Sequence, residues 1–265
     1  MLWFRHPYAW ILLTIIVLST FLGGLIATRQ RLGIWEDNHP PAKAIREAVY
    51  NLHHAIIGTP SPVPAAKRAF DVLLSGFSLL ISAPIWLLAL FAVWFEDPGP
   101  LFFVKNSVGR GGITFHQFKL RTMVRDAERI TGPVLAAEED TRALRTGRFL
   151  RKTALDELPQ LFNILRGDMS FVGPRPQRAV LVYEYLQAMP EFAERARVLP
   201  GLAGLAQVAG DYYITPRQKL RYDRIYANHA SLGFDLKLIA LAFALVFFLR
   251  WKPGGAGRIP RGWLH

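Results

Sequence analysis

Residues 148–176 read RFLRKTALDELPQLFNILRGDMSFVGPRP, the part of the chain with the most specific residue pattern. Two adjacent carboxylates, Asp156 and Glu157, lie there among several arginines. Guanidinium groups bind the oxygens of a phosphate, and a carboxylate can either hold a divalent cation or attack phosphorus. The stretch therefore favours chemistry on a phosphate group.

Pro159 limits where a helix can begin in this stretch. Proline is poorly tolerated inside a helix but is accepted in its first turn, so we predict a helix that begins near Asp156. Unpaired N–H groups and the helix dipole would then stabilise the Asp156 carboxylate as an anion. Two structural alternatives stand beside this reading: Asp156 is only an N-cap, or it pairs with Thr153 as in a capping box.

Arg175 lies between two prolines, Pro174 and Pro176, just after the turn that residues 167–170 predict. The prolines restrict the backbone of this arginine before any ligand arrives. A guanidinium held in this way suits a diphosphate. The alternative is that the prolines only stiffen a connecting loop.

The composition indicates an acidic partner at a membrane. Lys and Arg number 32 against 20 acidic residues, the formal net charge is +12, and 51% of residues are hydrophobic. Nucleic acid, anionic lipid or a phosphate-bearing substrate would suit such a charge. Three apolar stretches favour the bilayer. The chain has no cysteine, which excludes disulfides and allows a reducing compartment.

Residues 8–27 carry no charge and are long enough to cross the hydrocarbon core. A cleaved signal peptide is the alternative, but the apolar run is too long for one. More basic residues follow this stretch than precede it, so the positive-inside rule places the rest of the chain in the cytoplasm. We predict a transmembrane helix in 1–28, a Pro-rich cytoplasmic linker in 29–64, and a basic C-terminal tail in 251–265.

Residues 70–95 form a second long apolar stretch, with basic residues on both sides and Pro84 near its middle. A re-entrant helix that enters and leaves on the cytoplasmic face satisfies both features. Proline would break one backbone hydrogen bond, and the Ser82 hydroxyl could help to satisfy the freed carbonyl. The alternative is a spanning helix kinked at the proline.

The remaining patterns are shorter. Residues 238–249 are too few to span a membrane and predict an interfacial or core helix. Residues 115–120 alternate as a strand does. Arg121, Arg125 and Arg129 recur every four residues, which would align them on one helix face. Arginines also recur every three residues from 142 to 151, where Gly147 weakens a helix. Solvated surface is the alternative for both arginine runs.

Several pieces of sequence, in a fixed order over residues 65–250, resemble the monotopic phosphoglycosyl transferases, also called bacterial sugar transferases. They are KRAFD at 67–71, the apolar stretch with Ser82 and Pro84, DPGP at 97–100, FKLRTM at 118–123, LDELPQ at 155–160, GDMS at 167–170, VGPRP at 172–176, PG at 200–201 and DLK at 235–237.

The resemblance implies an α/β, mostly helical fold: a membrane-associated catalytic domain over 65–250, with a re-entrant helix hairpin and interfacial amphipathic helices. It implies transfer of a sugar 1-phosphate from a nucleotide diphospho-sugar, usually a UDP-sugar, to undecaprenyl phosphate, with release of UMP. This step begins bacterial surface glycan or exopolysaccharide synthesis on the cytoplasmic face of the inner membrane.

By the same resemblance, Asp156 is the nucleophile that forms a covalent aspartyl phosphoglycosyl intermediate, and Glu157 helps to hold Mg²⁺. Lys119, Arg151 and Arg175 match positions expected to contact substrate phosphates.

Further matches have less defined roles. Asp235 matches an acidic residue whose role the resemblance leaves open, and Asp168 is a candidate supporting residue. Ser82 and Pro84 match the break of the membrane hairpin.

The chain departs from the family pattern at three places. Ala83 separates Ser82 from Pro84, where the family has an adjacent Ser-Pro pair. Residues 201–205 read GLAGL, without the hydroxyl and aromatic ring of the family's usual segment, and Asp211 follows Gly210 where an arginine is common. The donor sugar therefore cannot be assumed.

The expected partners are a nucleotide sugar donor, undecaprenyl phosphate and anionic membrane lipids; a homo-oligomer is left open. Two other functional classes are the alternatives. A non-enzymatic scaffold of glycan assembly has no need of the acidic pair. A nucleic-acid-binding protein is favoured by charge alone, because no known binding motif accompanies it, so we expect no nucleic acid.

Overall fold

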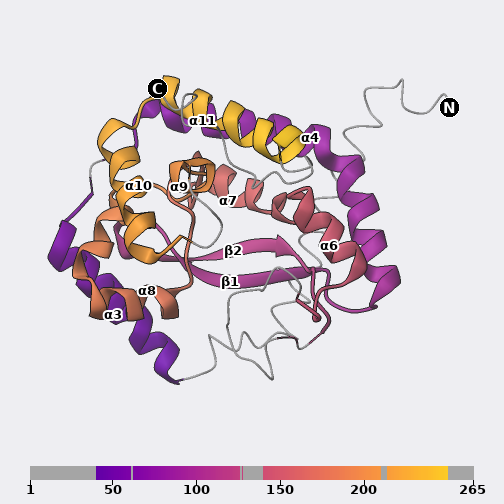
Figure 1. Ribbon diagram of the computed structural model, residues 1–265, viewed down its shortest axis with the longest axis horizontal. Helices are drawn as coiled ribbons and strands as arrows, with labels where there is room; N and C mark the ends of the chain where they lie inside the picture. Colours follow the sequence, from indigo (N-terminus) through magenta and orange to yellow (C-terminus); the bar gives the residue numbers. More distant parts are fainter. Residues whose placement is uncertain (1–39, 61, 126, 128–139, 210–213, 250–265) are drawn as a thin grey trace. The chain divides into compact units, whose positions relative to one another are not determined.

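The computed structural model describes residues 40–60, 62–125, 127, 140–209 and 214–249 (Figure 1). The predicted transmembrane helix in 1–28 and the predicted tail in 251–265 lie outside these residues. Most of the described chain is helical, with two small sheets, which agrees with the predicted class of a mostly helical α/β protein.

The elements follow one another in the order shown by Figure 1. They are α3 (Pro40–Ile57), α4 (Ala65–Glu96), β1 (Phe102–Val108), the 3-10 turn η2 (Arg110–Gly112), β2 (Thr114–Leu120), α6 (Arg145–Lys152), the 3-10 turn η3 (Leu155–Glu157), α7 (Gln160–Arg166), β3 (Ser170–Val172), α8 (Ala179–Ala188), the 3-10 segment η4 (Pro190–Arg197), β4 (Gly201–Ala203), α9 (Leu205–Ala209), α10 (Pro216–His229), α11 (Leu232–Ala244) and the π-helical η5 (Leu245–Leu249).

Two compact units make up the described chain. The first consists of the described parts of 76–104 and 118–161, and the second of the described parts of 34–75, 105–117 and 162–265. The strands β1 and β2 pair with each other through the turn η2, which confirms the predicted strand at 115–120. The strands β3 and β4 pair in parallel in the second unit, with Ser170 opposite Gly201.

Helix α4 holds the second apolar stretch as one helix of 32 residues with Pro84 inside it. Its ribbon bends along its length (Figure 1). The Ser82 hydroxyl donates to the carbonyl of Ser78 at 2.6 Å, whereas proline 84 frees the carbonyl of residue 80. The prediction that Ser82 bonds to the freed carbonyl is therefore wrong: its acceptor lies two residues earlier in the helix. A hydroxyl bond of this type also bends helices.

One face of α4 is buried and the opposite face exposes large apolar side chains. Soluble proteins rarely expose so large an apolar surface. Among the described residues, α4 is the one helix long and apolar enough to cross a membrane, a judgement from length and composition alone. The exposed side chains include Leu73, Phe77, Ile81, Leu88, Phe91 and Phe95, and the buried ones Ala83, Trp86, Leu90 and Val93.

The arginine runs differ from expectation in the first unit. Residues 121–125 form no helix: Met123 makes a β-bridge with Ala143, and the amide of Val124 donates to Arg142. Arg129 lies outside the described residues. The second run does enter a helix, α6. Glycine is required at position 147 of this helix, because an added Cβ would lie 2.1 Å from the carbonyl oxygen of Thr122.

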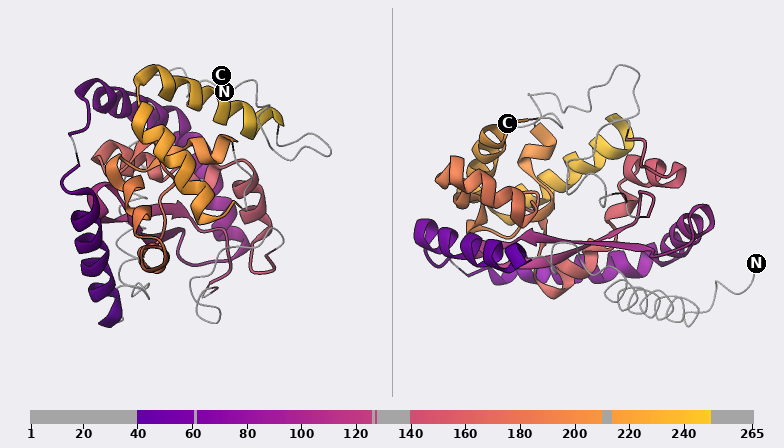
Figure 2. Two further views of the ribbon diagram at one scale, coloured as in Figure 1. Left: turned by 60° about the vertical axis from the view of Figure 1, so that its left-hand side comes forward. Right: turned by 90° about the horizontal axis from the view of Figure 1, so that it is seen from below.

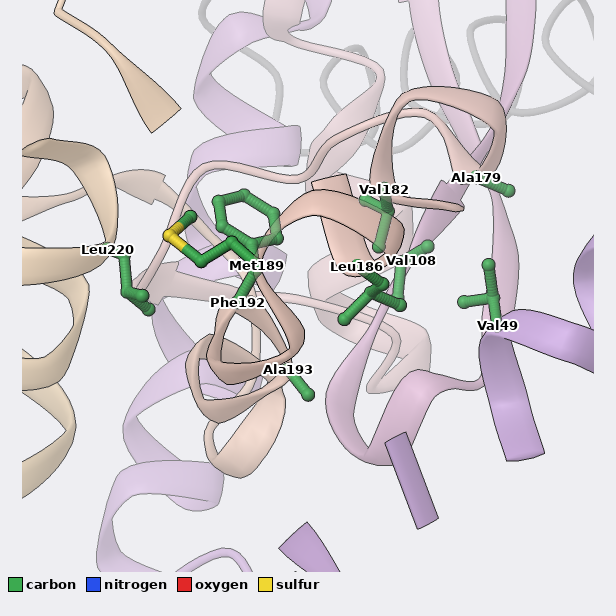
Figure 3. Close-up of a cluster of buried hydrophobic side chains, with 9 residues drawn as sticks. All are labelled: Val49, Val108, Ala179, Val182, Leu186, Met189, Phe192, Ala193 and Leu220. Carbon is green, nitrogen blue, oxygen red and sulfur yellow. The ribbon is translucent and has the colours of Figure 1, made fainter. Parts of the chain in front are cut away.

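Helix α3 lies in the segment that the sequence predicted as linker. Proline is accepted at the start of a helix, and Ile45, Val49 and Leu52 then recur on one face. That face packs on α8 and η4. The views of Figure 2 show the indigo α3 beside this orange segment from two further directions. Figure 3 shows the buried cluster, which consists of Val49, Val108, Ala179, Val182, Leu186, Met189, Phe192, Ala193 and Leu220.

A second buried cluster surrounds α11. Leu238 and Leu241 of α11 pack with Tyr226 of α10 and Val172 of β3. The other side of this helix exposes Phe243, and η5 continues with exposed phenylalanines. The predicted interfacial or core helix thus has one core face and one exposed apolar face.

Candidate functional site

The backbone turns sharply just before the acidic pair. Helix α6 ends at Lys152, and Ala154 takes a left-handed conformation with φ 57° and ψ 15°. It is the one non-glycine residue with positive φ in the described chain, a conformation that costs roughly 1–2 kcal/mol for an L-residue. This turn begins η3, so Asp156 and Glu157 lie in a single 3-10 turn before α7.

Neither structural alternative for Asp156 is observed. The residue that caps η3 is Ala154, without a side-chain bond. Thr153 is the C-cap of α6, and its hydroxyl donates to the carbonyls of Phe149 and Leu150, so it is not the N-cap that a capping box with Asp156 requires. The predicted helix begins at Gln160, later than expected, because the 3-10 turn and Pro159 come first.

Lys119 of β2 brings a positive charge to the acidic pair. Its Nζ lies 2.6 Å from Oε1 of Glu157 and 3.6 Å from Oδ2 of Asp156. Asp156 is 7% exposed, and Lys119 and Glu157 are mostly buried. Three of the predicted site residues therefore lie together. The positive charge of Lys119 partly offsets the two negative charges, and the effect is stronger at low dielectric.

Arg151, another predicted site residue, lies in the same unit. Its Nε donates to the Thr122 hydroxyl at 2.8 Å. Nearby, hydrogen bonds from Arg142 lower the pKa of Asp140 to about 2, and the charge of Arg151 contributes to this shift. The side chain of Arg151 is thus set by the segment that follows β2.

The carboxylates at the end of α4 were not predicted as site residues. Glu96 accepts from the amides of Arg145 and Thr146 at 2.7 and 2.8 Å, so it caps the start of α6. Asp97 pairs with Arg121 at 2.6 Å. These contacts fix α6, and hence Arg151, to the end of the apolar helix. A signal existed in the sequence: two acidic residues directly follow the apolar run.

The loop with Arg175 belongs to the second unit. The carbonyl of Pro174 accepts from the amide of Gly201, and the carbonyl of Arg175 accepts from Nη2 of Arg195 at 2.7 Å. Arg175 itself is partly exposed. The carbonyls of Pro174 and Arg175 are therefore both hydrogen-bonded to the rest of the second unit.

Asp235 has a clear place in the second unit. It is 1% exposed, and its carboxylate accepts from Lys67 at 2.6 Å and from the Tyr226 hydroxyl at 2.8 Å. Both partners also bond to the carbonyl of Val172. Burial raises the pKa of Tyr226. This network joins the start of α4 to β3, α10 and α11, which is an architectural role.

Asp168 also makes contacts of a structural kind. Its Oδ2 lies 3.3 Å from Nε of Arg166 and accepts from the amide of Asn163 at 3.2 Å. These bonds close the predicted turn after α7, where Gly167 has φ +99°. In the described chain, Asp168 therefore stabilises the turn after α7.

The donor set fits magnesium if a substrate supplies the remaining ligands. The described residues contain no group of three or more His, Cys, Asp and Glu side chains that could cage a metal. Magnesium typically uses one or two carboxylates together with substrate phosphates and water. The adjacent Asp156 and Glu157 supply such carboxylates.

Comparison with known proteins identifies the family. A family model described as bacterial sugar transferase matches residues 63–249. The chain belongs to this family. Each bacterial sugar transferase motif quoted above lies within the matched residues, whereas α3 precedes them.

Curated relatives of this bacterial sugar transferase have related names. UDP-N-acetylgalactosamine-undecaprenyl-phosphate N-acetylgalactosaminephosphotransferase of Aeromonas hydrophila is 35% identical over 73% of this chain and 47% of its own length. UDP-glucose:undecaprenyl-phosphate glucose-1-phosphate transferase of Caulobacter vibrioides is 42% identical over 69% of this chain and 71% of its own. Exopolysaccharide production protein ExoY of Sinorhizobium fredii is 36% identical over 66% and 82%. The chain thus spans less than half of the Aeromonas relative.

Proposed function

We propose that this chain transfers a sugar 1-phosphate from a UDP-sugar to undecaprenyl phosphate and releases UMP. The observation that carries the proposal is the acidic pair, Asp156 and Glu157, beside the ammonium group of Lys119. Family membership and the names of the relatives support the reaction class. Those names differ in the sugar, so the proposal leaves the donor sugar open.

The reaction has two displacements at one phosphorus atom. A carboxylate oxygen of Asp156 attacks the sugar-bearing phosphorus, and the bond to the bridging oxygen breaks, so that UMP leaves with that electron pair. An oxygen of undecaprenyl phosphate then attacks the same phosphorus and releases the Asp156 carboxylate. Each step forms one P–O bond and breaks one.

Cationic side chains would offset the negative charge of these steps. Lys119 lies next to the attacking carboxylate, and Arg151 and Arg175 are the proposed contacts for substrate phosphates. Glu157, with Asp156 beside it, would hold magnesium. When bound, this ion would offset charge on the diphosphate and on the leaving UMP.

The lipid substrate places the reaction at a membrane. The exposed apolar face of α4 supports contact with a bilayer. We propose that α4 is re-entrant and that the site faces the cytoplasm of a bacterial inner membrane, where the reaction would begin surface glycan or exopolysaccharide synthesis.

The test is a donor screen with membranes that contain the full chain. UMP release is measured for a panel of UDP-sugars, with and without undecaprenyl phosphate. We expect sustained release for at least one donor, dependent on the lipid, and its loss in Asp156→Asn. Glu184→Gln is the matched control, because Glu184 is an exposed carboxylate on α8. No release above the Asp156→Asn background with any UDP-sugar would overturn the proposal.

A further inference from the structure

Arg195 of η4 is a buried arginine that touches the loop with Arg175. It is 7% exposed, and its Nη2 donates to the Arg175 carbonyl at 2.7 Å. Its Nε lies 3.0 Å from Oδ2 of Asp223, and its guanidinium carbon lies 4.9 Å from the centre of the Phe192 ring. One planar group thus links α10, η4 and the loop.

The loop depends on such partners because two of its residues lack an N–H group. Pro174 and Pro176 cannot donate, so the loop is held through its carbonyls. The carbonyl of Pro174 accepts from Gly201, and that of Gln177 accepts from Val108 at 2.9 Å. Between these two backbone bonds, the Arg195 side chain holds the carbonyl of Arg175.

Asp223 is the buried charge partner of Arg195. The carboxylate is 2% exposed, and burial raises the pKa of Asp223 while the charge of Arg195 opposes that rise. A buried ion pair is costly to break, because either partner alone is a buried charge without compensation. The guanidinium therefore has little freedom to leave the loop.

Helix α3 packs against η4, the segment that carries Arg195. Val49 packs in one buried cluster with Phe192 and Ala193 of η4, as Figure 3 shows. His53 lines a cavity of about 20 Å³ together with Arg175 and Arg195, which is room for about one water molecule. The fit is close at η2 as well, since a Cβ on Gly112 would lie 2.6 Å from His53.

We propose that Arg195 is a positioning residue for Arg175, and that helix α3 completes this support by packing against η4. The inference rests on the proposed function, in which Arg175 contacts the diphosphate of the donor. Arg195 bonds to a backbone carbonyl, so it acts on the ligand through Arg175. Helix α3 precedes the residues that match the family model, and nothing in the family assignment gives it this role.

The test is a double-mutant cycle on the full chain, with UDP as the probe in isothermal titration calorimetry. Lysine at 195 keeps the charge but loses the planar fork that serves two partners. We expect Arg195→Lys to weaken UDP binding about tenfold in the native background and less than about twofold in an Arg175→Lys background. Arg197→Lys is the matched control: it lies on the same segment but is exposed, and we expect no change.

A milder variant tests the contribution of α3. Val49→Ala removes two methyl groups from the cluster without touching the loop. We expect it to weaken UDP binding roughly twofold to threefold, and we expect no such loss in the Arg175→Lys background. Thermal unfolding of each variant checks its fold. If Arg195→Lys does not fold, the Val49→Ala cycle alone tests the inference.

Two outcomes contradict the inference in different ways. Equal losses in both backgrounds, or no loss from either variant, would overturn the positioning role and leave the proposed function intact. Failure of the unsubstituted protein to bind UDP would overturn the proposed function and this inference with it.

Discussion

A single ammonium group, that of Lys119, lies next to both carboxylates of the acidic pair. Lys119→Met keeps the length of the side chain but removes the charge. We expect kcat/KM for the donor to fall about 10²-fold, the typical loss when one group that stabilises developing charge is removed. The measurement is UMP release as a function of donor concentration.

Lys152→Met is the control for this substitution. Lys152 is an exposed lysine at the end of α6, so its loss should change kcat/KM by less than about twofold, as surface substitutions usually do. Equal effects of the two substitutions would mean that Lys119 acts only through the net charge of the protein.

At the residue level, the sequence predicted some partners and missed others. Asp156, Glu157 and Lys119 were predicted together through the family resemblance, and the first unit brings them together. The pairing of Arg195 with Asp223 was missed. Nothing local in the sequence selects one arginine and one aspartate, since the fold alone decides which buried charges meet.

At the scale of elements, α4 combines a buried face, an exposed apolar face and an internal proline. The chain has no cysteine, so single cysteines can be introduced for labelling. If α4 is re-entrant, Ala66→Cys and Ile113→Cys should both react with a membrane-impermeant thiol reagent from the cytoplasmic side only. Both positions are exposed in the described chain.

Pro84→Ala provides the comparison for this experiment. The substitution restores a backbone donor inside α4 and favours a straighter helix, so we expect part of the population to label from opposite sides and the turnover to fall. Labelling of the two cysteines from opposite faces with Pro84 intact would show a spanning helix and contradict the re-entrant path.

Prediction of elements succeeded where the pattern was local. The strand β2, the turn after α7 and the long apolar helix follow from alternation, glycine and hydrophobicity. Helix α3 was missed because its prolines and polar residues indicated a linker, while its apolar face has meaning only against α8 and η4. The spacing of Arg121 and Arg125 indicated a helix, but residues 121–125 are not helical. Both arginine side chains pair with Asp97 instead.

At the scale of the whole molecule, the family match extends over residues 63–249 and includes parts of both compact units. The acidic pair and Lys119 lie in the first unit, and the Arg175 loop and the Asp235 network lie in the second. Family membership could be predicted from the ordered motifs. The support from α3 could not, because it lies ahead of every motif and depends on tertiary packing.

The central claim, that Asp156 is the nucleophile, is tested most directly by a single turnover without the lipid. The protein is incubated with magnesium and a UDP-sugar that the screen has shown to be a donor, and UMP and the intact peptide masses are measured. We predict about one UMP per active enzyme and a sugar-phosphate adduct on the peptide that contains Asp156. Asp156→Asn should keep the fold and give neither product. Lipid-dependent turnover by Asp156→Asn, with no adduct on the unsubstituted protein, would contradict the account.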